Sequence, residues 1–149
     1  IIKKRKKNKL VSFKKNKIIS HPVKKIYNLV ADVKKYPEFL PWCSDITIKE
    51  KTKKYIITEV KVGFKNINET YVCRVLLYPQ KRITLEYISG PFEYLEIDWK
   101  FKKITKIKTD VSFFCNFKFR SIFLRLSTSF FLENAIEKMV DAFEKKLNN

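Results

Sequence analysis

The chain has 149 residues, of which 45% are hydrophobic and 15% aromatic, so it can form one domain with a buried core and is not a disordered chain. Lys and Arg number 33 against 15 Asp and Glu, a formal net charge of +18 that points to nucleic acid, ribosomes or an anionic membrane as partners. One His, two Gly and three widely spaced Cys exclude a metal-ligand cluster and a glycine-rich phosphate loop, and there is no apolar run of about 18 residues that could span a membrane. We expect the three cysteines to be free thiols.

The chain begins with a basic stretch at 1–17 that contains no acidic residue, and the first acidic residue is Asp32. Such a stretch is typical of an organelle-targeting remnant or of a polybasic arm attracted to acidic surfaces. The alternative is a solvated arm whose end, Val11 to Ile19, becomes the first strand. We therefore divide the chain into a basic arm at 1–17, which runs into the first strand, and a single domain at 18–147.

A short helix is expected from Val23 to Val33, because Pro22 precedes a run of apolar residues at helical spacing. The next stretch, 36–43, contains two prolines four residues apart, so only one helical turn fits between them. It is also rich in large apolar side chains, which either plug the end of the core or form a lid that touches a membrane. We favour the lid, and its expected ligand-contacting residues are Tyr36, Pro37, Phe39, Leu40, Pro41 and Trp42.

From Asp45 to Arg120 the apolar residues alternate with period two and short polar turns interrupt them, which predicts about six strands in an antiparallel meander. The residues of one phase are mostly apolar and are expected to face inward. Those that we expect to line an interior ligand tunnel are Val60, Val62, Phe64, Glu69, Tyr71, Val75, Leu85, Leu95, Trp99, Phe113 and Phe117. Cys73, Ile97, Cys115 and Phe119 are in phase with them.

The last element is expected to be one continuous helix at 121–147, about 40 Å long at 1.5 Å per residue, because the segment has no Gly or Pro and its apolar residues recur every three or four positions. Leu132, Met139 and Phe143 belong to its apolar stripe and are expected in the tunnel wall. A sheet that is apolar on one face can bury that face by curling around this helix. The predicted class is therefore α+β, with a curved antiparallel sheet of six to seven strands around a long C-terminal helix and two short helices near 22–42.

A sheet of this kind encloses more space than one helix face fills, so we expect either a filled core or an apolar cavity for an uncharged, lipid-like ligand. Glu69 is the only carboxylate in phase with an inward row. It either holds a polar head group or lies at the exposed start of its strand. The sequence contains no nucleophile elbow, zinc-protease motif or phosphate loop, so we do not expect an enzyme or a catalytic cofactor.

Several stretches, in this order along the chain, carry a family resemblance. They are LVADV at 29–33 with YPEFLPWC at 36–43, VGF at 62–64 with ETY at 69–71, GPF at 90–92 with WKF at 99–101, and FKFRS at 117–121 with MVDAFE at 139–144. Together they resemble the coenzyme Q-binding START-domain proteins, a branch of the polyketide cyclase-like helix-grip superfamily.

The resemblance implies a helix-grip fold with an apolar tunnel that holds ubiquinone or a related prenyl lipid. It implies a quinone chaperone that supports respiratory electron transport and quinone biosynthesis. Its place would be peripheral to the mitochondrial inner membrane on the matrix side, or at the cytoplasmic face of the inner membrane in a bacterium. The expected partners are an isoprenoid lipid and an anionic membrane surface, and no DNA.

A sister branch of the same superfamily is described as a ribosome-association toxin that blocks the joining of ribosomal subunits. Trp42 and the FKFRS run favour the quinone branch, whereas the basic start and the high charge leave contact with the ribosome open. A polyketide or lipid cyclase, as found elsewhere in the superfamily, is a remote alternative.

Overall fold

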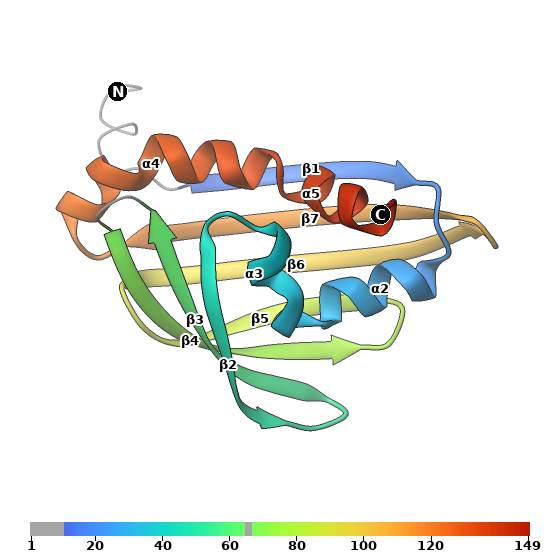
Figure 1. Cartoon of the computed structure of the whole chain (residues 1–149), viewed down its shortest axis with the longest axis horizontal. Helices are drawn as coiled ribbons and strands as arrows, with labels where there is room; N and C mark the ends of the chain where they lie inside the picture. Colours follow the sequence, from blue (N-terminus) through green and yellow to red (C-terminus); the bar gives the residue numbers. More distant parts are fainter. Residues whose placement is uncertain (1–10, 65–66) are drawn as a thin grey trace.

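The computed structural model describes residues 11–64 and 67–149, apart from the side chains at positions 64, 67 and 128–130. It has one strongly curved antiparallel sheet with the helices on its inner face (Figure 1). This is the α+β helix-grip arrangement that the sequence predicts. The division into an arm at 1–17 and a domain at 18–147 stays a prediction, and residues 1–10 lie outside the described residues.

The sheet has seven strands in the order β1-β7-β6-β5-β4-β3-β2, so the first two strands along the chain form its two edges. The segment between them crosses the inner face and contains the three short helical elements (Figure 1). In chain order the elements are β1 (Val11–Ile19), α2 (Val23–Ala31), a 3-10 turn η1 (Val33–Lys35), α3 (Tyr36–Phe39), β2 (Cys43–Lys51), β3 (Tyr55–Phe64), β4 (Ile67–Tyr78), β5 (Arg82–Ser89), β6 (Phe92–Thr105), β7 (Lys108–Phe119), α4 (Ile122–Glu137) and α5 (Met139–Leu147). The predicted helix that was to reach Val33 therefore ends at Ala31.

The period-two pattern of the sequence is confirmed by burial, most clearly in β7. Every second residue of this strand is buried, from Thr109 to Phe119. Because successive side chains of a strand point to opposite faces, such a row turns one apolar surface toward the helices. The buried apolar members of the row are Val111, Phe113, Cys115, Phe117 and Phe119.

The prediction of one continuous C-terminal helix is wrong in one respect, because the helix is interrupted at Lys138. The backbone of Lys138 has φ −92° and ψ 2°, and it ends α4, with α5 beginning at the next residue. Neither Gly nor Pro marks this position. The break lets α5 turn Met139, Val140 and Phe143 into the core, so tertiary packing rather than a helix-breaking residue sets it.

Phe143 fastens α5 to both the sheet and α3. Its side chain is only 2% exposed, and its ring centroid lies 5.0 Å from that of Trp99, 5.3 Å from Tyr36 and 5.0 Å from Phe39. The rings meet at 70–86°, the edge-to-face geometry that aromatic pairs prefer. This cluster fills one end of the interior.

Ion pairs hold the outer side of α5 against β1. The Lys17 ammonium lies 2.6 Å from a Glu144 oxygen and 2.9 Å from an Asp141 oxygen. The hydrogen bond to Glu144 raises the pKa of Lys17, and the hydrogen bond from Lys17 lowers the pKa of Asp141. Because the partners are partly exposed, each pair contributes about 1 kcal/mol or less and serves mainly to set the position of the helix.

The turn between β5 and β6 depends on Gly90. Its φ of 143° lies in the region that disfavours side chains, and a Cβ there would be 2.6 Å from the Cβ of Tyr71 and 2.9 Å from its Cα. A side chain at this position would therefore displace β4 at Tyr71.

We predict that G90A lowers the free energy of unfolding by about 1–3 kcal/mol, because it combines backbone strain with a clash against Tyr71. Urea titration followed by far-ultraviolet circular dichroism measures the loss. The matched control is G63A, since a Cβ at Gly63 would meet its nearest atoms at 3.4–3.5 Å and its φ is not in the strained region. Equal losses in the two variants would contradict this account.

Candidate functional site

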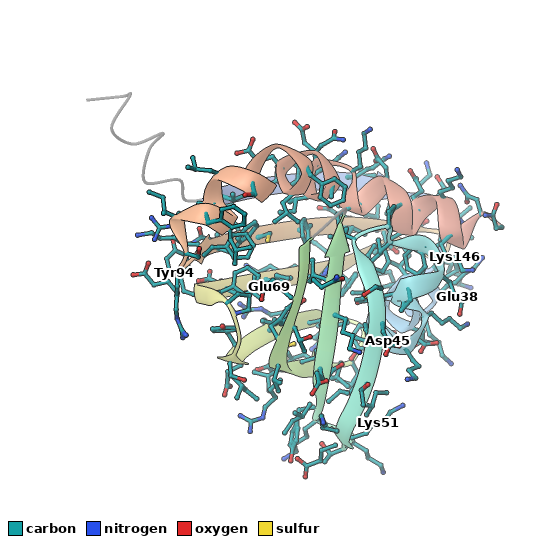
Figure 2. The ribbon with its side chains drawn as sticks, turned by 60° about the vertical axis from the view of Figure 1, so that its left-hand side comes forward. Glu38, Asp45, Lys51, Glu69, Tyr94 and Lys146 are labelled. Carbon is teal, nitrogen blue, oxygen red and sulfur yellow. The ribbon has the colours of Figure 1, made fainter. Side chains whose placement is uncertain are left out.

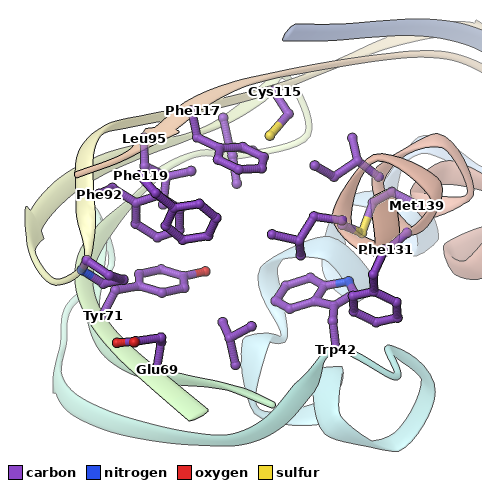
Figure 3. Close-up of a pocket in the computed structure, with 16 residues that line it drawn as sticks. Trp42, Glu69, Tyr71, Phe92, Leu95, Cys115, Phe117, Phe119, Phe131 and Met139 are labelled. Carbon is purple, nitrogen blue, oxygen red and sulfur yellow. The ribbon is translucent and has the colours of Figure 1, made fainter. Parts of the chain in front are cut away.

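An apolar cavity, here named the α4 cavity, lies between the sheet and the second half of α4 (Figure 3). Its volume is about 70 Å³. Strands β3, β4, β6 and β7 form one wall, α4 and the start of α5 form the other, and Trp42 lies across from the strands. The lining residues are Trp42, Val62, Glu69, Tyr71, Pro91, Phe92, Leu95, Ile97, Cys115, Phe117, Phe119, Phe131, Leu132, Ala135, Ile136 and Met139.

A second cavity of about 60 Å³, the α3 cavity, lies between the sheet, η1–α3 and α5. The Phe143 cluster forms one of its walls. Its lining residues are Val33, Tyr36, Leu40, Trp42, Ile46, Thr58, Val60, Tyr71, Cys73, Val75, Ile83, Thr84, Leu85, Ile97, Trp99, Phe113, Met139 and Phe143.

Trp42, Tyr71, Ile97 and Met139 line both cavities, so these side chains form the partition between them. Each cavity has room for several water molecules, which need about 10–15 Å³ apiece on this measure. The two spaces are thus neighbouring parts of one interior. A long ligand can use both only if the partition moves, and Met is among the most adaptable side chains for such a movement.

Two side chains in the wall of the α4 cavity carry oxygen, Glu69 and Tyr71, two positions apart on β4 (Figure 3). Burial raises the pKa of the Tyr71 phenol well above its usual value, so the hydroxyl stays protonated and can donate a hydrogen bond. In the described part of the chain, its hydroxyl has no hydrogen-bond partner. By contrast, the Tyr36 hydroxyl donates to the carbonyl of Val30, and the Tyr87 hydroxyl accepts from the backbone N–H of Phe92.

Comparison of the sequence with known protein families identifies the type of domain. The family described as "Polyketide cyclase / dehydrase and lipid transport" matches residues 19–144. The chain belongs to this family.

Relatives with similar sequences have names that describe two different functions. The ribosome association toxin RatA of Rickettsia prowazekii is 37% identical over 141 residues, which cover 92% of this chain and 96% of that protein. The mitochondrial coenzyme Q-binding protein COQ10 homolog B of Xenopus laevis is 28% identical over 143 residues, which cover 93% of this chain and 59% of that protein.

Solved structures agree on the fold. The ZhuI aromatase/cyclase of Streptomyces sp. R1128 superimposes with a TM-score of 0.80 at 15% identity, covering 94% of each chain. The 18 kDa protein CC1736 of Caulobacter crescentus superimposes with a TM-score of 0.72 at 25% identity, covering 92% of this chain and 95% of that one. Among the described residues of this family member, no helix is long and apolar enough to cross a bilayer, and no three metal-ligating side chains come together.

Most residues that the sequence predicted for the tunnel line one of the two cavities. Val62, Glu69, Leu95, Phe117 and Leu132 line the α4 cavity only; Trp42, Tyr71 and Met139 line both; Tyr36, Leu40, Val60, Val75, Leu85, Trp99, Phe113 and Phe143 line the α3 cavity only. The side chain of Phe64 lies outside the described residues. Pro37, Phe39 and Pro41 line neither cavity. That these residues contact a ligand stays a prediction.

The expected lid at 36–42 needs a correction at Leu40. We expected Leu40 to lie at the mouth of the pocket against a membrane, but its side chain is 2% exposed and lines the α3 cavity. Leu40 ends the single turn of α3, and its backbone N–H donates to the carbonyl of Tyr36 at 2.9 Å, which turns the side chain inward. Phe39 is likewise packed between Tyr36 and Phe143. Trp42 is half-buried, and its role as a lid stays a prediction.

Sequence reasoning missed Phe92 as a wall residue, because strict alternation places it out of phase with Leu95. The pairing of β6 with β7 shifts register between Phe92 and Tyr94, so Phe92 and Leu95 both face inward. Such a bulge adds one residue to the strand and leaves little trace in a single sequence. Ile97, Cys115 and Phe119 also line the α4 cavity. They alternate in phase with the predicted inward residues, so the sequence pattern could have predicted their position in the wall.

The three cysteines of this family member are free and buried, and burial raises the pKa of each thiol to about 12. Cys73 lines the α3 cavity and Cys115 the α4 cavity. Since the thiolate is the nucleophile, thiols with such a pKa react slowly near neutral pH.

We predict that Ellman's reagent at pH 8 labels fewer than one thiol per folded chain within minutes, and all three after denaturation in guanidinium. Absorbance at the wavelength of the released thiolate gives the count. Fast labelling of the folded protein at Cys73 or Cys115 would show that the cavities open widely to solvent.

Proposed function

We propose that this protein binds a prenyl lipid of the quinone class in the joined α4 and α3 cavities and carries it without transforming it. The observation that carries the proposal is an interior walled almost entirely by apolar side chains, lined also by the buried Tyr71, whose hydroxyl forms no hydrogen bond with another described residue. The lipid-transport description of the family supports it, as does the name of the coenzyme Q-binding relative.

The apolar walls suit an isoprenoid tail. Each tail CH₂ that moves from water into such a wall contributes about 0.8 kcal/mol, so most of the affinity comes from the tail. A tail of several isoprene units is longer than either cavity. It therefore enters both only when the partition at Trp42 and Met139 moves aside.

The side of the α4 cavity at Glu69 and Tyr71 suits a neutral ring with carbonyl groups. The Tyr71 phenol donates a hydrogen bond to one quinone oxygen, a bond that the hydroxyl does not form with any other described residue. Glu69 lines the same cavity and disfavours a phosphate head group, because two negative charges at short range repel each other. This pair of residues selects a quinone over a phospholipid.

In a cell, a carrier of this kind takes quinone from a membrane and delivers it to respiratory or biosynthetic enzymes. It acts peripherally, at the matrix side of the mitochondrial inner membrane or at the cytoplasmic face of a bacterial inner membrane.

We predict that purified protein expressed in a quinone-containing host yields quinone or another prenyl lipid, chemically unchanged, on organic extraction and mass spectrometry. Affinity should rise several-fold per added tail carbon until the joined cavities are full. The variant A135F, which fills the α4 cavity, should lose uptake, whereas A135S should keep it. Extracts without any prenyl lipid, or equal uptake by both variants, would contradict the proposal.

We predict that Y71F weakens the binding of a short-chain ubiquinone about three- to tenfold, the size of one neutral hydrogen bond, and leaves the binding of a prenyl hydrocarbon unchanged. Quenching of tryptophan fluorescence measures both affinities. The control is Y87F, which removes a hydroxyl that bonds the Phe92 backbone and should lower stability without distinguishing the two ligands. Equal weakening for both ligands in Y71F would show that the hydroxyl does not contact the ring.

Ribosome association is the second candidate function, favoured by the relative at 37% identity and by the net charge of +18. It requires co-sedimentation with ribosomal subunits that weakens steeply with salt, as cations are released from phosphates. Sedimentation free of subunits at low salt would exclude it. Because such binding uses the surface, A135F should not affect it, and this separates it from the carrier function.

A further inference from the structure

Three large apolar side chains lie exposed together on the first two turns of α4. Ile122, Phe123 and Leu126 are 64%, 69% and 74% exposed. Their spacing of one and four positions places them within about 100° on one side of the helix, since neighbours in sequence differ by 100°. We call this surface the α4 patch. A contiguous exposed apolar group of this kind indicates a contact site rather than a scattered surface residue.

The α4 patch stands on an anchored part of the fold. The Ser121 hydroxyl accepts a hydrogen bond from the backbone N–H of Leu124 and caps the helix, and the Arg125 guanidinium donates to the carbonyls of Phe119 and Arg120 at 2.7 and 3.2 Å. These bonds fix the turn from β7 into α4. The start of α4 lies at one end of the molecule (Figure 1), so the patch can meet a flat surface.

The residues that neighbour the α4 patch in the sequence carry positive charge and no negative charge. Residues 111–132 contain Lys118, Arg120 and Arg125 and no acidic residue. Val11 of β1 pairs with Phe117 of β7, so β1 begins at this same end, and the sequence has six Lys and Arg among residues 3–9. Within the described residues, Glu93 is the acidic group paired with Lys118, at 3.2 Å. Apolar side chains with a surplus of positive charge match the interface of an anionic bilayer.

We propose that the α4 patch docks on an anionic lipid bilayer and brings the α4 cavity to the membrane surface. The proposal rests on the proposed lipid-carrier function for its purpose. The same helix supplies Leu132, Ala135 and Ile136 to the cavity wall, so one element joins the docking surface to the binding site. Three side chains are far too few for the roughly 1,200 Å² of a stable protein interface, whereas a bilayer accepts a few inserted apolar groups.

The surface also contrasts with the stretch at 36–42, where sequence reasoning placed the membrane contact. Leu40 of that stretch is buried and Phe39 is half-buried against Phe143, whereas the α4 patch is exposed. Figure 2 shows two carboxylates in or near that stretch, Glu38 and Asp45, whereas residues 111–132 contain no acidic residue.

The test is co-sedimentation with sucrose-loaded vesicles of phosphatidylcholine, with and without phosphatidylglycerol. We expect binding to the mixed vesicles, and a loss of about tenfold per side chain in F123S/L126S, because each Ser removes one buried apolar group from the lipid contact. The matched control is Y78S/I88S. These residues are 48% and 46% exposed on β4 and β5, outside the α4 patch, and their replacement should leave vesicle binding unchanged.

A second measurement separates this inference from the carrier function. Both variants should bind a water-soluble ubiquinone with one isoprene unit as tightly as the parent protein does, since none of the changed residues lines a cavity. If the parent binds no quinone but F123S/L126S still loses vesicle binding, the carrier function fails and the docking surface stands. Equal vesicle binding by parent and F123S/L126S, or an equal loss in the control, overturns the inference. It is equally overturned if F123S/L126S instead abolishes ribosomal co-sedimentation or dissociates a dimer in analytical ultracentrifugation.

Discussion

The packing of Phe143 against Trp99, Tyr36 and Phe39 is the constraint on which the rest of the structure depends. It joins α5, the middle of the sheet and the single turn of α3 at one buried point. With the helices fastened there, one end of the space under the curved sheet is filled by rings. The remaining space lies along α4 and under α3, so the contacts that stabilise the fold also decide where the cavities are.

Buried polar groups of the described residues are mostly satisfied within the chain, and Asn116 Oδ1 on β7 is a buried atom among them without a hydrogen-bond partner. Thr58 and Thr109 are buried and donate to the carbonyls of Thr47 and His21, and the Tyr36 hydroxyl bonds the Val30 carbonyl. These groups cost little because their hydrogen bonds are made within the chain. The Tyr71 hydroxyl, on a side chain that lines both cavities, forms no hydrogen bond with another described residue. A carbonyl oxygen of a ligand would remove the cost of leaving it unpaired.

The helix α4 differs from α5 in how its apolar residues are used. In α5 they lie on one stripe and are buried, as Val140 and Leu147 illustrate. In α4 they extend around the helix: Leu132 and Ala135 face the cavity, while Phe123 and Leu126 face solvent. A helix that is apolar on both sides buries one side against the sheet and needs a second apolar environment for the other. Basic residues near the exposed side favour an anionic membrane surface as that environment. The ion pairs of Lys17 with α5 show that part of the positive charge is paired with carboxylates of the same chain.

The sequence by itself determined the strands and their inward faces, because the direction of a strand side chain follows from period two alone; Phe113, Phe117 and Trp99 are examples. Short turns likewise determined the antiparallel order, and the helical spacing near the C-terminus determined that Met139 and Phe143 face the sheet. Only the tertiary structure decided the break at Lys138, the inward turn of Leu40 and the inward position of Phe92 beside its bulge. It also decided that Trp42 and Tyr71 divide the interior into two cavities. The reason is physical: a local pattern specifies which face of an element is apolar, whereas the curvature of the sheet and the fit of distant side chains specify how closely those faces meet.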